Sequence, residues 1–335
     1  MSSRYRRKTM KRWMKLVATG LAMASLAGAA EARTLRIGHG TTETNPRHVA
    51  AQFFGKRVDE LSKGKLKISV GGNAQFGDDV EMLTALRLGT LDMSLNAQGP
   101  MANIVPEVGA LSLPFLFKDP PTAWKVLDGA VGEDLATKAE AKQLVVLAYW
   151  DNGIRHITNN VRPITTPADL KGLKIRVPSD PVAIESFTAL GASPTPMAFS
   201  ELYLALQQGV VDGQENPLMN IYHSKFQEVQ KYLSLTSHKY EMTPFLMSKT
   251  TWSSLSADDR KVIKQAAIEA RDHQRELATQ ADRELRQKLE AAGMKINDVD
   301  IEPFRAGTKA VYDKWQNGPN AELVKRLTTA ARGAS

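Results

Sequence analysis

Three polar residues near the ends of predicted strands carry the side chains best suited to hold a small organic anion. Arg155, Arg176 and Asn216 each stand at or close to the end of a short β-rich run. Ligands of open α/β sheets bind outside the carboxyl ends of the strands, and a guanidinium offers a planar fork of donors that matches the two oxygens of a carboxylate. We expect Arg176 to supply that fork. A salt bridge within the protein is the alternative interpretation for either arginine.

Enzyme motifs are missing from the sequence. None of the 335 residues is a cysteine, so the chain has no thiol nucleophile, no CxxC redox pair and no cysteine-bound metal. The six histidines form no HExxH pair, and neither GxSxG nor a Walker A loop occurs. The run 38–40 lacks the third glycine of a dinucleotide fingerprint, and Asp78 and Asp79 are interpreted as residues that cap a helix. We expect no catalytic residue, no cofactor and no bound metal.

The elements that must position these side chains follow a repeated order. Short β-rich runs at 35–40, 66–71 and 91–96 alternate with amphipathic helical patterns, and the second half continues the order with runs at 144–150 and 155–158. Alternation of this kind favours sheets that are covered by helices. We expect an α/β protein of two lobes, with mixed or parallel sheets around a cleft.

One predicted helix is much longer than the others. From Ala257 to Ala292, apolar residues recur every three or four positions, Ser256 precedes the pattern as an N-cap, and Gly293 follows it. At 1.5 Å per residue, this helix would be about 50 Å long. A coiled-coil segment is the alternative. Because the apolar stripe is rich in alanine, we favour a strut that lies across both lobes.

Residues 1–32 have the composition of a secretory signal peptide. Seven lysines and arginines fall within residues 1–15, an uncharged stretch covers 16–30, and Ala30-Glu31-Ala32 forms an A-x-A cleavage signal. The uncharged stretch is shorter than the ~20 residues of a bilayer span. Cleavage removes seven positive charges and one negative charge, so the formal net charge falls from +8 to +2. We therefore expect a protein that is exported to the periplasm or out of the cell, with no nucleic-acid partner and no membrane insertion.

Several segments after the signal peptide have distinctive sequences. GASPTPMAFSELY occupies 191–203 and VDGQENP occupies 211–217. Further segments are AQFG at 74–77, LGTLDM at 88–93, LPFLF at 113–117, LKGLKIRV at 170–177 and FQEVQKY at 226–232. Together these segments resemble the solute-binding proteins of TRAP (tripartite ATP-independent periplasmic) transporters, the DctP family, and the resemblance covers essentially the whole mature chain.

This resemblance implies a fold similar to that of type II periplasmic binding proteins, with two lobes that a long helix bridges. The first lobe would comprise residues 34–152 and 242–281, and the second would comprise residues 153–241 and 282–335. It also implies that the chain captures a small organic acid without transforming it and delivers it to the membrane permease subunits of the transporter. We expect the protein to be a monomer.

The same resemblance assigns roles to individual residues. Arg176 matches the family arginine that pairs with the ligand carboxylate, Arg155 matches a second cleft arginine that assists it, and Asn216 matches a polar contact. Phe199 matches an aromatic wall residue. Ser179 falls where members that bind sialic acid carry a contacting Asn.

The resemblance also narrows the class of ligand that we expect. Gly40 and Ala97 stand where members that bind sialic acid place an Asn and a Glu, while 147–153 and 166–172 are similar to members that bind sugar-derived acids such as diketogulonate. We expect a hydroxylated monocarboxylate, such as a sugar acid. Polar side chains would form hydrogen bonds with its hydroxyl groups, and the candidates are Asn96, Gln98, Asn152, Gln214, His39 and Glu43. Trp150 would belong to the core or to the cleft wall. A C4-dicarboxylate binder, an exported enzyme acting on acidic sugars and an accessory protein of a sensor are the alternatives.

Overall fold

The computed structural model describes residues 32–333, and the chain from residue 34 onward forms one compact unit. The predicted signal peptide, residues 1–32, lies outside the described residues except for Ala32. None of the helices in the described range combines the length and the apolar character that a membrane span requires.

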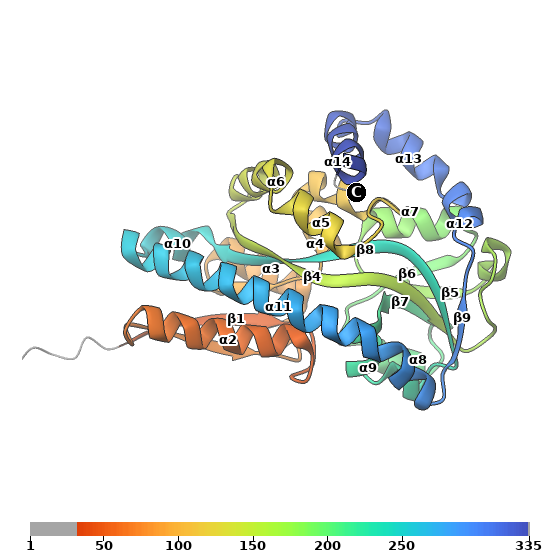
Figure 1. Cartoon of the computed structure of the whole chain (residues 1–335), viewed down its shortest axis with the longest axis horizontal. Coiled ribbons are helices and arrows are strands. Elements are labelled where there is room, and N and C mark those ends of the chain that lie inside the picture. The colour runs from red at the N-terminus through yellow and green to blue at the C-terminus, as the bar shows by residue number, and fades with distance from the viewer. Residues whose placement is uncertain (1–31, 334–335) are drawn as a thin grey trace, which may run out of the picture. The chain divides into compact units, whose positions relative to one another are not determined.

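Residues 32–333 build one mixed sheet of nine strands (Figure 1). The strands are β1 (Arg33–His39), β2 (Leu66–Gly71), β3 (Met93–Leu95), β4 (Leu144–Asn159), β5 (Lys174–Val177), β6 (Ser193–Pro196), β7 (Gly213–Pro217), β8 (Tyr232–Ser248) and β9 (Lys295–Asp298). Eight of them follow the order β2-β1-β3-β8-β4-β7-β5-β6, and β9 pairs with β8. The β1–β3, β5–β6, β5–β7 and β8–β9 pairs are parallel, whereas the β3–β8, β4–β7 and β4–β8 pairs are antiparallel. The predicted mixture of parallel and antiparallel strands is thus confirmed, although the strands form one continuous sheet and not several sheets.

Two long strands, β4 and β8, join the two halves of the sheet. The end of β8 pairs with β3 and its beginning pairs with β9, while β4 pairs with β7 only from Arg155 to Asn159. The ladder between β4 and β8 shifts register at three places, one of them between Asp151 and Gly153. Such a shift bends a strand pair. Gly153 adopts a φ of +105° there, which glycine tolerates without strain.

The sequence pattern predicts this region only in part. Two strands, 144–150 and 155–158, are predicted where the structure has the single strand β4, because the shift at 151–153 and burial on both faces hide the alternation. β8 has no predicted counterpart. Buried polar residues such as Lys239 and Glu241 interrupt its hydrophobic pattern.

Two helices, α2 (Pro46–Leu61) and α7 (Pro181–Ala189), each begin after an N-cap residue whose side chain accepts a backbone N–H of the first turn. Asn45 accepts the backbone N–H of Arg47 at 2.9 Å at the start of α2, and Asp180 accepts that of Val182 at 3.0 Å at the start of α7. A proline occupies the first position of both helices. The helices are α2 (Pro46–Leu61), α3 (Asp79–Leu88), α4 (Gln98–Ala102), α5 (Pro120–Leu127), α6 (Ala130–Glu140), α7 (Pro181–Ala189), α8 (Leu202–Gln207), α9 (Leu218–His223), α10 (Lys249–Ser254), α11 (Ala257–Ala291), α12 (Glu302–Gly307), α13 (Lys309–Gln316) and α14 (Ala321–Gly333).

α11 confirms the predicted long helix to within one residue. The Ser256 hydroxyl accepts the backbone N–H of Asp259 at 3.1 Å at its start. Residues of its first half, around Ala266, lie in a hydrophobic core with α2 and β1, whereas residues of its second half, around Leu285, lie in a core with α8 and α9. Figure 1 shows α11 extending along β4 past both groups of elements. One continuous helix therefore joins two cores, as the strut prediction states.

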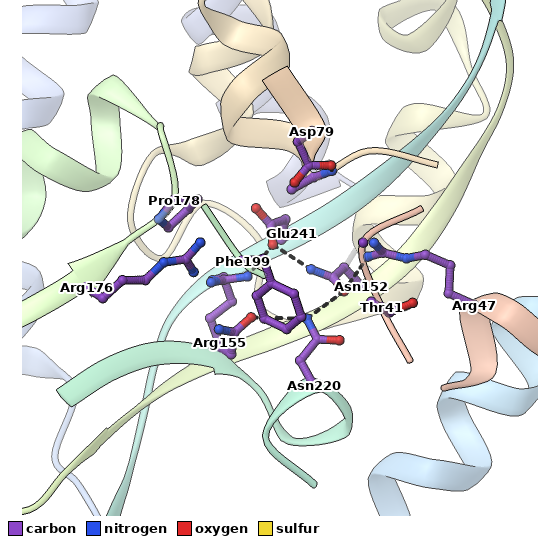
Figure 2. A pocket seen from close by; sticks show the side chains of 13 residues that line it. Thr41, Arg47, Asp79, Asn152, Arg155, Arg176, Pro178, Phe199, Asn220 and Glu241 are labelled. Carbon is purple, nitrogen blue, oxygen red and sulfur yellow. Dashed lines mark hydrogen bonds and ion pairs between the residues drawn. The ribbon is translucent and has the colours of Figure 1, made fainter. Parts of the chain in front are cut away.

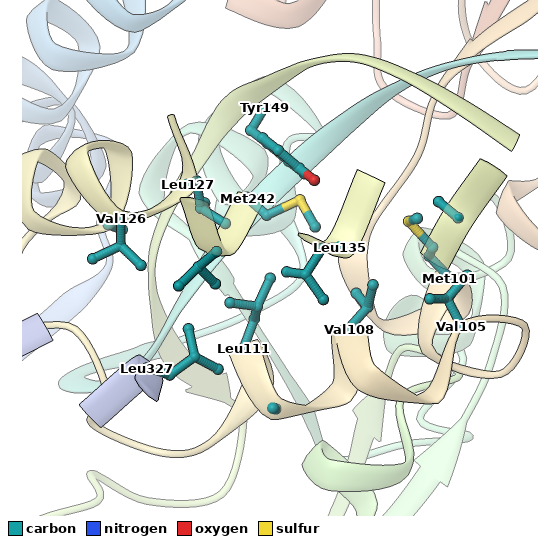
Figure 3. Packing of buried hydrophobic residues seen from close by; sticks show 14 of the residues in the cluster. Met101, Val105, Val108, Leu111, Val126, Leu127, Leu135, Tyr149, Met242 and Leu327 are labelled. Carbon is teal, nitrogen blue, oxygen red and sulfur yellow. The ribbon is translucent and has the colours of Figure 1, made fainter. Parts of the chain in front are cut away.

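A third core lies behind β4 and β8, between α5, α6 and α14 (Figure 3). The Tyr149 side chain of β4 packs there, and its hydroxyl donates to the Gly132 carbonyl at 2.7 Å. A side chain at Gly132 has no space, because a Cβ would lie 1.8 Å from the Leu127 carbonyl oxygen. This core packs against β4 at Tyr149, just before the buried polar residues Asp151 and Asn152 of the same strand.

Candidate ligand-binding site

A pocket lies beside the middle of β4 and β8 and is lined by residues from both halves of the sheet (Figure 2). The space without atoms is about 390 Å³, including solvent at its open side. Its lining consists of Gly40, Thr41, Arg47, Asp79, Ala97, Asn152, Arg155, Arg176, Pro178, Phe199, Asn216, Asn220 and Glu241.

Arg176 is a buried cation without a carboxylate partner. Its Nε and Nη2 donate to the Met197 carbonyl at 3.0 and 2.6 Å, and the guanidinium carbon lies 5.8 Å from the centre of the Phe199 ring. Among the described residues, no carboxylate oxygen lies within 4.0 Å of it, and Nη1 has no acceptor. Burial lowers the pKa of Arg176 to about 10, although Glu215 opposes that effect. The free edge of the fork is therefore available to an anion from outside the protein.

Arg155 differs from Arg176, because protein carboxylates already hold it. Its Nε pairs with Glu215 and its Nη1 pairs with Glu241, while Nη2 donates to the Glu215 carbonyl at 2.6 Å and to Glu215 Oε1 at 2.8 Å. Burial alone would lower the pKa of Arg155, but these two carboxylates outweigh it and raise the pKa. The geometry makes Arg155 the centre of a buried ion-pair network that borders the pocket.

That network continues away from the pocket along β8. Lys239 donates to Asp180 at 2.8 Å and lies 3.5 Å from Glu241, and His238 Nε2 lies 3.1 Å from Glu215. Burial would raise the pKa of Glu215, but the positive charge of Arg155 and the hydrogen bond from His238 keep it well below its ordinary value. The carboxylates around Arg155 therefore stay ionised.

Three asparagines complete the polar wall of the pocket. Asn152 donates to Glu241 at 2.5 Å and accepts from Arg47 Nη2 at 2.8 Å. Asn220 donates to Asn216 at 3.0 Å and to Asn152 at 3.3 Å. These bonds connect β4, β7 and α9, so the amides are held in place before any ligand arrives.

Sequence reasoning did not single out Arg47, Asp79, Asn220 or Glu241 as pocket residues. Arg47 and Asp79 lie in the first turns of α2 and α3. Capping and the helix dipole were sufficient to explain Asp79, and Arg47 was not interpreted at all. Within the pair of acids, that interpretation holds for Asp78, whose backbone N–H donates to Glu81 at 2.9 Å. The only available signal was their position directly after predicted strands and turns.

Two predicted site residues lie directly behind the lining instead of in it. Gln214 donates to Thr158 at 2.9 Å and accepts from Asn216 at 2.5 Å, so it supports Asn216 from below. Asn96 donates to Asp79 Oδ1 at 3.2 Å and supports that residue in the same way. Both side chains are fully buried.

Two further predicted residues belong to the interior. Gln98 donates to Ser112 at 2.8 Å and accepts the backbone N–H of Met242 at 3.2 Å. Trp150 packs in the core against Phe245, with ring centres 5.3 Å apart. Of the two positions expected for Trp150, the core and the cleft wall, the structure shows the core. The side chain has no exposed surface with which to contact a ligand.

The remaining predicted residues, His39, Ser179 and Glu43, lie close to lining residues in the chain but outside the lining itself. His39 is buried, with Nε2 3.0 Å from His48 Nδ1 and Nδ1 3.0 Å from the Thr41 hydroxyl. Burial lowers the pKa of His39 to about 3, so it is neutral. Ser179 is half-buried and Glu43 is exposed.

Comparison with known proteins identifies the family. Residues 37–318 match the family model described as bacterial extracellular solute-binding protein, family 7 (DctP). The chain belongs to this family. It is 39% identical over 290 residues to the 2,3-diketo-L-gulonate-binding periplasmic protein YiaO of Escherichia coli, covering 86% of this chain and 88% of that protein.

Other relatives agree with this membership of the DctP family. The sugar acid binding protein DctPAm from Advenella mimigardefordensis, solved in complex with galactonate, superposes with a TM-score of 0.89 at 37% identity, over 91% of this chain and 99% of that chain. An uncharacterized protein of Sinorhizobium fredii, y4mM, is 47% identical over 281 residues, which cover 84% of this chain. The chain spans only about half of that relative, 52% of its length. These findings confirm the predicted resemblance and the predicted α/β fold.

Metal binding has no support in the geometry of residues 32–333. No group of three or more histidine, aspartate or glutamate side chains in that range is arranged to hold a metal ion. The polar groups of the pocket are instead guanidinium, carboxamide and carboxylate groups, which suit a polar organic ligand.

Proposed function

We propose that this DctP-family protein is the solute-binding component of a TRAP transporter, that it binds a sugar acid or another hydroxylated monocarboxylate, and that it does not transform this ligand. Arg176 carries the proposal. A buried charge without a counter-ion is unfavourable, and a ligand carboxylate on the free edge of its fork would supply that counter-ion.

The unequal pairing of the arginines supports a carboxylate in the ligand. Glu215 and Glu241 already hold Arg155, whereas Arg176 has no ion pair with a carboxylate of the described residues and can take one from a ligand. The carboxamide groups of the lining asparagines both donate and accept hydrogen bonds, which matches the hydroxyl groups of a sugar acid.

The ligands of the relatives support the same class. Solved relatives hold galactonate at 37% identity and D-erythronate at 38% identity, and YiaO is a diketogulonate-binding protein. All three ligands carry one carboxylate and several hydroxyl or keto oxygens. We therefore place the carboxylate on Arg176, with Arg155 adjacent, and the hydroxyl groups against Asn152, Asn216 and the Phe199 wall.

We further propose that the chain works as a periplasmic monomer with two lobes, 34–152 with 242–281 and 153–241 with 282–335. These boundaries cut β4 and β8 where their register shifts, opposite Asp151 and Gly153. Closure of the lobes would exclude water and strengthen the contact between Arg176 and the ligand. The closed protein would then deliver the ligand to the permease subunits.

Calorimetry on the chain without residues 1–32 tests this proposal. The protein is unfolded and refolded to remove any bound ligand, and is then titrated with galactonate, D-erythronate and succinate. Arg176→Ala should weaken binding of the cognate acid by about 2–5 kcal/mol, or roughly thirty-fold to several thousand-fold. Arg176→Lys should also bind poorly, because a lysine supplies a point charge without a fork. Arg87→Ala, a change at an exposed arginine, is the control.

Three outcomes would contradict parts of the proposal. If Arg176→Ala binds the cognate acid as tightly as the wild type, the assigned role of Arg176 is wrong. Tight binding of succinate with no binding of monocarboxylates favours the C4-dicarboxylate alternative, for which one solved relative with bound succinate, at 36% identity, is a precedent. Recovery of an altered sugar acid after incubation, detected by mass spectrometry, favours an enzyme.

A further inference from the structure

A second unpaired guanidinium lies in the same pocket as Arg176. Arg47 is 5% exposed, and its Nη2 donates to Asn152 and to the Thr243 hydroxyl, both at 2.8 Å. Within the described range, no carboxylate oxygen lies within 4.0 Å of Arg47, and its Nε and Nη1 have no acceptor. Figure 2 shows Arg176 and Arg47 at opposite sides of the pocket. Arg47 therefore offers free donors at the side away from the proposed carboxylate position.

The Asp79 side chain offers a free acceptor in the same pocket. Asp79 Oδ1 accepts the backbone N–H of Ala97 at 2.9 Å and the Asn96 amide at 3.2 Å, whereas Oδ2 has no donor among the described residues. Asp79 and Arg47 both line the pocket without an ion pair between them. Burial raises the pKa of Asp79 and lowers the pKa of Arg47, while the charge of each favours the ionised form of the other. The free donors of Arg47 and the free oxygen of Asp79 therefore belong to the same pocket.

A hydroxyl group fits this pair of side chains, and a carboxylate does not. A hydroxyl group can accept from the guanidinium and donate to the carboxylate at the same time. An ionised carboxylate only accepts, and it would meet the negative charge of Asp79 at close range. The Asn96 amide and the Ala97 N–H hold Asp79 Oδ1 without bringing a positive charge to it, and the Ala97 bond and the charge of Arg47 favour the ionised carboxylate against its burial.

We propose that Arg47 and Asp79 determine specificity by reading a hydroxyl group at the end of the ligand remote from its carboxylate. This inference rests on the proposed function, and it adds a prediction about which sugar acids the pocket accepts and which it rejects. The pocket accepts an aldonate, which ends in a hydroxymethyl group, and rejects the aldarate of the same carbon chain, which ends in a second carboxylate. Galactonate and galactarate form such a matched pair.

The test compares the dissociation constants of galactonate and galactarate for the wild type and for Asp79→Asn. Asparagine keeps the oxygen that Ala97 and Asn96 hold but removes the negative charge. We expect wild-type protein to prefer galactonate by at least tenfold, and Asp79→Asn to weaken galactonate about tenfold while it tightens galactarate. Asp258→Asn removes an equal charge at an exposed site in α11 and should leave the ratio unchanged.

Folding of each variant is checked by its thermal unfolding transition, and Arg47→Lys provides a second variant. Arg47→Lys keeps the charge but loses the fork, so it should weaken galactonate and leave the affinity for a carboxylate-only acid such as butyrate unchanged. Equal affinity of the wild type for both acids, or an unchanged ratio in Asp79→Asn, overturns the assignment while the proposed function stands. Binding of no monocarboxylate at all overturns the proposed function and this inference with it.

Discussion

Replacing Arg176 by methionine should make the ligand-free protein more stable while it removes binding. Arg176 is 3% exposed, and burial lowers its pKa from 12.5 to about 10. A base with a lowered pKa is less stable in its charged form in the folded protein, and this change corresponds to about 3 kcal/mol. Methionine also gives up the two hydrogen bonds, which share the single Met197 carbonyl; a hydrogen bond from a charged donor contributes about 1.5–3 kcal/mol. Because one acceptor is involved, the expected result is a free energy of unfolding that is higher by up to about 1.5 kcal/mol.

The same substitution at Arg155 should have the opposite effect on stability. Arg155 neutralises Glu215 and Glu241, which are both fully buried. Arg155→Met leaves two carboxylates without their partner, and the loss of one member of a buried pair costs about 3–5 kcal/mol. The two arginines lie in one pocket, so the comparison separates a residue kept for binding from a residue kept for folding.

Urea unfolding at pH 7.5, followed by tryptophan fluorescence, measures both effects on protein that has been refolded without ligand. Calorimetry with galactonate on the same samples measures binding. A destabilised Arg176→Met, or an Arg155→Met protein as stable as the wild type, would show that the assignment of unpaired and paired guanidinium groups is wrong.

Two further predictions concern pH and packing. Burial lowers the pKa of His156 to about 3, so the unfolded chain takes up a proton below pH ~6.5 that the folded protein refuses. Stability should therefore fall as the pH falls, by about 2 kcal/mol for this residue between pH 8 and pH 5, and His156→Gln should reduce that loss in urea titrations at the two pH values. In the second case, a Cβ at Gly213 would lie 2.1 Å from the Thr158 carbonyl oxygen, so Gly213→Ala should destabilise the protein by about 3 kcal/mol. Gly333→Ala, where a Cβ has open space, should unfold at the same urea concentration as the wild type.

Part of the pocket could be predicted from the sequence alone. Arg176 and Asn216 stand near strand ends as predicted, whereas Arg155 lies inside β4 because the two predicted strands form one. Asn152 and Phe199 belong to segments that resemble the family. The structure places all five residues in the lining. The long helix could be predicted as well, because its apolar spacing and its N-cap are local features.

The other half of the pocket depends on contacts that are distant in the sequence. Glu241 lies on β8, whose buried ion pairs give it a polar sequence that does not resemble a central strand. Arg47 and Asp79 become pocket residues only because α2 and α3 bring their first turns against β4 and the end of β3. Trp150 is the reverse case. It lies two residues before Asn152 in the sequence, yet it packs into the core beneath α11.

Because α11 belongs to two cores at once, its length is constrained in a way that its exposed surface does not reveal. Inserting one residue near its middle would rotate everything beyond that point by about 100° around the helix axis. Leu285 and Leu289 would then leave the core of α8 and α9, although no residue of that core had been replaced. Even a seven-residue insertion, which nearly restores the rotation, would push the two cores about 10 Å apart. A change in the length of α11 therefore disrupts one of the two cores that the helix joins.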